Sequence, residues 1–317
     1  QTINTGILYN KNIIFVAYFI SNLIQRNNLK TLNKLFEKIE LSKPKFSELL
    51  KFATIITHSF YSLSEKRALT IYSDLIKYES FRNTVPLLYV DYSHLRGIYF
   101  KVLTLIKKES PIESDLFFVE LMDFYRQFYT GGICKNQEIK RPENFSTFNE
   151  VLKGRFYSYK IMLSSAVDSS LKEELFKECK TTKVSMFLEE VIPALLIKEE
   201  YKILTKLSDK FYEQIFESDN WSDYTMSSIY LIALANINWY SNNISTAKGN
   251  LELVVLDKIE LSYYDYVSLF YYQTKIKISY LESDAITNAA SFLILKKLVL
   301  KTGFIKFLEI SKKYLLN

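Results

Sequence analysis

Apolar side chains recur along most of this chain at intervals of three and four residues. That spacing places them on one face of an α-helix, with the polar residues on the opposite face. In the first quarter of the chain, stripes of this kind predict helices over about residues 12–25, 29–40, 44–60 and 64–76. Short polar stretches separate them, so the helices are expected to form antiparallel pairs.

The same pattern continues to the end of the sequence. Ser110-Pro111-Ile112-Glu113 is a helix start signal, because serine caps the first amide groups and proline is tolerated in the first turn. Beyond it, the periodicity predicts three helix pairs and a short terminal helix that caps the array. Their expected ranges are 184–196 with 201–216, 224–241 with 245–256, 264–281 with 286–301, and 304–316.

One internal stretch interrupts the helical pattern. Residues 130–146 contain the Gly131-Gly132 pair, a proline and mixed charges, which is typical of a loop. We therefore expect N-terminal helical repeats over residues 1–129, a boundary at 130–146, and C-terminal repeats over 147–317. One continuous array is the alternative.

Composition supports the all-α prediction. The 317 residues include only 7 Gly and 5 Pro, too few for the corners of β-sandwiches and barrels or the glycine-rich turns of doubly wound folds. The chain also has 24 Tyr and 23 Phe. Such rings are expected to fill irregular spaces between helices, and an aromatic-lined groove is the alternative use.

An internal similarity indicates a repeated unit. Residues 15–42 read FVAYFISNLIQRNNLKTLNKLFEKIELS, and residues 230–262 read YLIALANINWYSNNISTAKGNLELVVLDKIELS. Each contains an aromatic-led helix, an Asn-Asn turn, a second helix and the sequence KIELS at its end.

The unit at 230–256 resembles a degenerate tetratricopeptide-type repeat. The resemblance rests on Ala233 and Ala235, the Trp239-Tyr240 pair, and Ala247 after the Asn-Asn turn. It implies antiparallel helix pairs stacked as a right-handed α-solenoid with a concave face. The chain departs from the pattern in its late tryptophan, its irregular spacing and the lack of a closing proline. It is also similar to the helical effector domains of peptide-pheromone-sensing regulators, although no DNA-binding helix-turn-helix is found in residues 1–80.

Charge and cysteine content narrow the function classes. The net charge is +6, but only seven of the 41 basic residues are arginine and no run of five basic residues occurs, which argues against nucleic acid as a partner. The longest apolar run near the N-terminus, residues 13–20, is too short to span a membrane. Cys134 and Cys179 form no CxxC motif, so a reducing, cytoplasmic location is the default expectation.

The sequence contains no motif for catalysis, metal binding or a cofactor. His58 and His94 are the only histidines, and neither lies in a metal-ligand pattern; phosphate-binding glycine loops are absent. The adjacent carboxylates Glu189-Glu190 and Glu199-Glu200 point to different sides of a helix and are expected to be solvated. A Cys134–histidine pair is the remaining enzymatic alternative.

These observations predict a non-catalytic scaffold that binds a protein or a peptide. Asn236, Trp239 and Tyr240 lie on the first helix of the 230–256 unit, which would face the groove. An asparagine amide can bind an extended peptide backbone, and rings can pack on its side chains. In the alternative interpretation Trp239 is a wedge between helices and Asn236 a satisfied polar position. The alternative function is the peptide-sensing effector domain of a regulator without its DNA-binding part.

Overall fold

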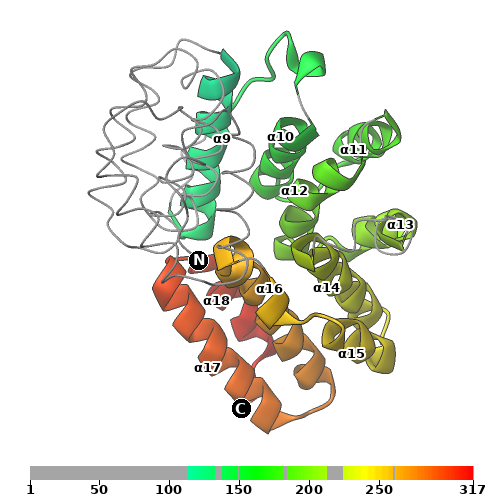
Figure 1. Ribbon diagram of the computed structural model, residues 1–317, viewed down its shortest axis with the longest axis vertical. Coiled ribbons are helices and arrows are strands. Elements are labelled where there is room, and N and C mark those ends of the chain that lie inside the picture. Colours follow the sequence, from blue (N-terminus) through cyan, green and yellow to red (C-terminus); the bar gives the residue numbers. More distant parts are fainter. Residues whose placement is uncertain are drawn as a thin grey trace, which may run out of the picture. The chain divides into compact units, whose positions relative to one another are not determined.

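The structure is a computed structural model, and it describes residues 113–132, 138–148, 150–181, 184–212, 224–259 and 261–316 (Figure 1). Helices account for 79% of this part of the chain, and it contains no strand. The predicted all-α class is therefore confirmed for these residues. The four helices expected in the first quarter of the chain, the first copy of the repeat, His58, His94 and Cys134 lie outside the described residues.

The chain divides into two compact units. One comprises residues 1–119 with 260–262, and the other comprises residues 120–259 with 263–317. Almost all described residues belong to the second unit, which also contains the stretch 130–146.

The second unit is built from helices of nine to 21 residues, with shorter pieces at its C-terminal end. They are α9 (Glu113–Tyr129, which begins in the first unit), α10 (Glu150–Leu163), α11 (Ser169–Thr181), α12 (Val184–Ile197), α13 (Tyr201–Tyr212), α14 (Tyr224–Tyr240), α15 (Ile244–Glu252), α16 (Leu261–Leu281), α17 (Ala285–Thr302) and α18 (Lys306–Ser311). Short 3₁₀ turns are η1 (Phe145–Thr147), η3 (Leu256–Lys258) and η4 (Lys312–Tyr314). The six paired helices predicted from residue 184 on correspond to observed helices, and α9 follows the predicted start signal, whose residues 110–112 lie outside the described residues.

The ends of two predicted helices differ from the structure. Helix α15 stops at Glu252, four residues before the predicted end at 256, and within the KIELS sequence Lys258 ends η3 while Leu261 and Ser262 begin α16. The β-branched Val254 and Val255 follow the end of α15, and Val255 is extended, which suits such residues better than a helix. The terminal segment is shorter than expected, because it is split into α18 and η4.

Three helical hairpins share one turn geometry. The turns α12–α13, α14–α15 and α16–α17 place Glu199, Asn242 and Ser283 in the left-handed region, with φ of 56°, 59° and 57°. In each, the next N–H donates to the carbonyl five residues earlier, at 2.8–3.0 Å. This is the Schellman arrangement, which satisfies the last carbonyl groups of a helix. The three positions are 43 and 41 residues apart, so the structural repeat is longer than a 34-residue unit.

The residue after the turn starts the next helix. Asn243 and Asp284 are the N-caps of α15 and α17, and their side chains accept hydrogen bonds from the backbone N–H groups of Thr246 and Thr287. The Asn242-Asn243 pair noted in the sequence therefore supplies both the left-handed residue and the cap. A single polar pair can end one helix and start another because asparagine tolerates both conformations.

Neighbouring hairpins pack through their first helices. Helix α10 packs on α12, α12 packs on α14, and side chains of α14 hydrogen-bond to α16. Figure 1 follows this order from green (α10, α12) through olive (α14) to orange (α16). Buried rings fill the spaces between helices, as the composition predicts; Tyr129, for example, stacks between Phe304 and Phe307 of the C-terminal segment.

The packing of α10 against α12 depends on a glycine. A Cβ atom at Gly154 of α10 would lie 2.8 Å from the carbonyl oxygen of Phe187 and 3.0 Å from Cβ of Glu190, both on α12. Gly249 of α15, by contrast, has no atom within 4 Å of the position a Cβ would take.

These two glycines give opposite expected responses to alanine. Gly154→Ala should lower the free energy of unfolding by about 1–2 kcal/mol, because α10 and α12 must move apart. Gly249→Ala should raise it by about 0.5–1 kcal/mol, because alanine is the better helix former and meets open space. Urea denaturation of both variants checks this, and equal effects of the same sign would contradict the packing described.

Candidate functional site: a buried lysine in an aromatic cage

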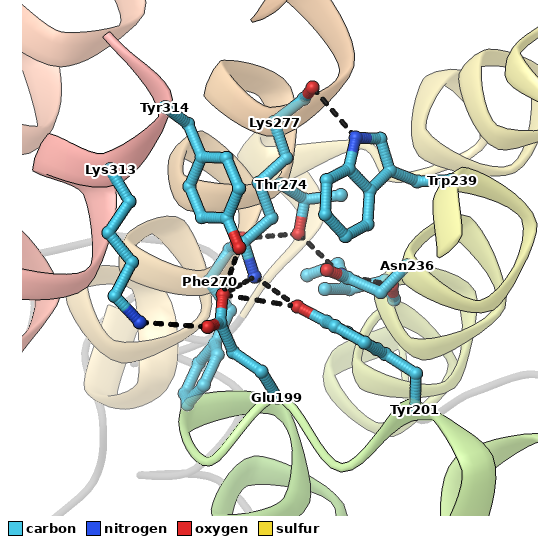
Figure 2. A network of polar contacts seen from close by, with 10 residues as sticks. Glu199, Tyr201, Asn236, Trp239, Phe270, Thr274, Lys277, Lys313 and Tyr314 are labelled. Carbon is cyan, nitrogen blue, oxygen red and sulfur yellow. Dashed lines mark hydrogen bonds and ion pairs between the residues drawn. The ribbon is translucent and has the colours of Figure 1, made fainter. Parts of the chain in front are cut away.

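The most heavily buried charge in the described part of the structure is Lys277 of α16. Its side chain is 1% exposed. The rings of Tyr201, Trp239 and Tyr314 surround its ammonium group, with centroids 5.2, 5.5 and 5.4 Å from Nζ (Figure 2). The ammonium also donates a 2.5 Å hydrogen bond to the hydroxyl of Tyr201, so this hydroxyl and the surrounding rings compensate part of the cost of burial.

Glu199 provides the counter-charge from the α12–α13 turn. Its Oε1 lies 3.2 Å from Nζ of Lys277 and accepts a 2.6 Å hydrogen bond from the hydroxyl of Tyr314. Its Oε2 lies 3.0 Å from Nζ of Lys313. One carboxylate thus joins the first of the three hairpins to α16 and to the C-terminal turn η4. Figure 2 shows it at the centre of the network.

The protonation equilibria agree with an ion pair. Burial lowers the pKa of Lys277 from 10.5 to about 8, and Glu199 limits the fall. Burial by itself would raise the pKa of Glu199, but the charge of Lys277 and the hydrogen bonds from Tyr314 and Lys313 lower it below its ordinary value. Both groups are therefore charged at neutral pH. Because the ammonium is enclosed, this lysine is positioned to stabilise the fold and not to react with a substrate from solution.

Two of the three residues predicted for a groove make hydrogen bonds between α14 and α16 at this cage. Asn236 is 2% exposed, and its Nδ2 donates to Oγ1 of Thr274 at 2.7 Å and to the carbonyl of Ile232 at 2.9 Å. Trp239 donates from Nε1 to the carbonyl of Lys277 at 2.8 Å. The interhelix roles weighed in the sequence analysis, a satisfied polar position and a wedge, are the ones that these contacts provide.

Tyr240 differs from its neighbours because it reaches solvent. Its side chain is 48% exposed, and its ring stacks on Tyr201 with centroids 5.1 Å apart. Tyr201, one of the rings of the cage, therefore packs against the exposed ring of Tyr240. Of the three predicted residues, Tyr240 is the most exposed to solvent.

The expectation that the adjacent carboxylates are solvated charges is wrong for two of them. Glu199 has 19% of its side chain exposed and holds Lys277. Glu190 of α12 pairs with Arg155 of α10, at 2.9 Å and with 5% of the arginine side chain exposed. Sequence reasoning missed Lys277, Glu199 and Tyr314 as a group because they lie up to 115 positions apart. The equivalence of Glu199 with Asn242 in the repeated turn is the one signal that could have marked it.

The described residues contain no group of three or more His, Cys, Asp or Glu side chains placed to hold a metal ion. Cys179 is a buried free thiol whose pKa is raised to about 12, chiefly by burial. No helix among those described has the length and apolar character needed to cross a bilayer.

Comparisons with protein-family models, curated proteins and solved structures gave no significant match. The resemblance to tetratricopeptide-type repeats therefore stays a prediction that rests on the residues quoted for it.

The ion pair can be tested by a double-mutant cycle. Glu199→Gln should lower the free energy of unfolding by about 3 kcal/mol, because it leaves a buried ammonium without a counter-charge. The double variant Glu199→Gln/Lys277→Met should lose less than Glu199→Gln alone, because no buried cation remains. Denaturant unfolding of the two single variants and the double variant measures the coupling. Additive losses would show that the pair is not coupled.

The lowered pKa of Lys277 predicts a specific pH dependence. Below pH about 8 the lysine is protonated in both folded and unfolded chains, so its contribution is constant. Between about 8 and 10.5 the unfolded chain binds more protons, so raising the pH favours the folded state. The stability of the wild type should therefore rise relative to Lys277→Met from neutrality to pH roughly 9.5. A constant difference between the two proteins would contradict this assignment.

Proposed function

We propose that this chain is a non-catalytic helical-repeat scaffold, a right-handed α-solenoid of the tetratricopeptide type, that binds a protein or a peptide in a concave groove. The observation that carries the proposal is the recurrent hairpin turn at Glu199, Asn242 and Ser283. Helical hairpins that repeat and pack through their first helices bury one face on their neighbours. They leave an extended surface on the other face, which such proteins use for binding.

The cage residues contribute to binding by fixing this surface. Trp239 and Asn236 tie α14 to α16 through hydrogen bonds to Lys277 and Thr274, so the two helices cannot slide past each other. Tyr240 is then held on a rigid support by its contact with Tyr201. Rings with little conformational freedom lose little entropy on binding and are frequent among residues that dominate an interface.

The proposal is tested by capture of partners from a native cell extract with the purified chain as bait. Tyr240→Ala should weaken retention of a genuine partner by about tenfold or more, because it removes the exposed ring without removing a described hydrogen bond. Leu253→Ala is the matched control, since Leu253 is 58% exposed and lies beyond the end of α15. It should retain the partner as the wild type does.

The nature of the captured molecule decides between the candidate functions. A protein whose retention depends on Tyr240 supports the scaffold, and a short peptide alone supports the alternative of a peptide-sensing effector domain. Retention of only nucleic acid or a metabolite, unaffected by Tyr240→Ala, would overturn both.

A further inference from the structure

The segment Lys312–Leu316 is bound by the rest of the chain in the way that a peptide is bound. Asn288, in the first turn of α17, is 1% exposed. Its Nδ2 donates to the carbonyl of Tyr314 at 3.0 Å, and its Oδ1 accepts from the N–H of Leu316 at 3.2 Å. One amide side chain thus pairs with both backbone groups that flank Leu315, which is extended at φ −83° and ψ 136°. The Asn288 side chain therefore binds the backbone of the segment, and this contact does not depend on which side chains the segment carries.

Side-chain contacts are made at the two preceding positions. The ring of Tyr314 packs edge-on against Trp239 and Tyr280, at centroid distances of 5.5 and 5.9 Å. Its hydroxyl donates to Glu199, and the ammonium of Lys313 pairs with the other oxygen of the same carboxylate. Figure 2 shows Lys313 and Tyr314 converging on Glu199 from the same side. An aromatic and a basic side chain are therefore recognised separately.

The groups that make these contacts come from four different elements. Glu199 follows α12, Trp239 is on α14, Tyr280 is on α16 and Asn288 is on α17. The segment itself stays at the surface, since Lys313 is exposed and Tyr314, Leu315 and Leu316 are partly exposed. A surface segment that is held by hydrogen bonds to its backbone, by ring packing and by an ion pair resembles a bound peptide more than a part of the core.

We propose that Glu199, Trp239, Tyr280 and Asn288 form a peptide-binding site that the chain's own residues Lys313–Leu316 occupy. The site takes short peptides in which a basic and an aromatic residue lie in one 3₁₀ turn and two apolar residues follow, the first of them extended. Such a peptide binds by displacing the segment. This inference rests on the proposed peptide-binding function and names its site and its class of ligand.

The chain's own segment and a free peptide compete for the same site, and the tether gives the segment an advantage. A segment joined to its site by a short connection has an effective concentration in the millimolar range. A free peptide with the same contacts must compete with it, so its apparent affinity for the intact chain is reduced. Removing the segment's contacts should therefore increase the affinity for an added peptide.

The experiment uses the full chain with the site vacated by Tyr314→Ala/Leu316→Pro. The first substitution removes the ring and the hydroxyl. The second removes the N–H that Asn288 accepts from, and it keeps Leu315 in the extended conformation that it already has. The probe is a fluorescently labelled peptide of sequence Lys-Lys-Tyr-Leu-Leu, and binding is measured by fluorescence anisotropy. Circular dichroism confirms that the variant is folded.

The vacated variant should bind this peptide at least tenfold more tightly than the wild type. The peptide Lys-Lys-Ala-Leu-Leu should bind at least tenfold more weakly than the probe, because it lacks the ring. Lys312→Ala is the matched protein control, since Lys312 is exposed and none of the contacts above involves its side chain. It should bind the probe as the wild type does. Equal affinities of wild type and vacated variant, or no binding to either folded protein, would overturn the proposal.

A second measurement keeps the proposal testable if the double variant does not fold. Excess unlabelled peptide should speed amide hydrogen exchange at Leu316 in the wild type and leave the core of α14 unchanged. No change in exchange at saturating peptide would overturn displacement. Failure here, with retention of a partner that depends on Tyr240, would remove this site and leave the proposed scaffold function in place.

Discussion

The described structure depends on one buried charge and the carboxylate that balances it. Lys277 is buried near the C-terminal end of α16, where a lysine without a counter-charge would cost several kcal/mol. Glu199 can balance it because it lies in the turn after α12, from which its carboxylate reaches Nζ of Lys277. This ion pair joins the end of α12 to α16.

The conformation of the turn makes this contact possible. Glu199 has positive φ, a state that costs roughly 1–3 kcal/mol for a residue with a side chain. The equivalent positions carry Asn242 and Ser283, whose short polar side chains make no such long-range contact among the described residues. The same backbone turn thus joins the two helices in each of three hairpins. At one of them the side chain, that of Glu199, also forms an ion pair with a distant helix.

The C-terminal segment completes the polar network from outside. Tyr314 closes the third side of the cage and shares Glu199 with Lys277. The proposed recognition of a peptide needs a rigid aromatic surface beside a fixed carboxylate, and these are the groups that also hold the packed helices together.

The sequence by itself determined the helical class, the three hairpins beyond residue 184 and the Asn-Asn turn, because helix periodicity and capping are local properties of neighbouring residues. It also predicted Asn236, Trp239 and Tyr240 as residues of a groove, which stays a prediction. Only the tertiary structure decided that Asn236 is buried, that Glu199 is not a solvated charge and that Asn288 clamps a backbone segment. These features depend on which helices pack against each other although they are tens of residues apart in the sequence. The periodicity of a helix depends on neighbouring residues and does not say which helices will pack together.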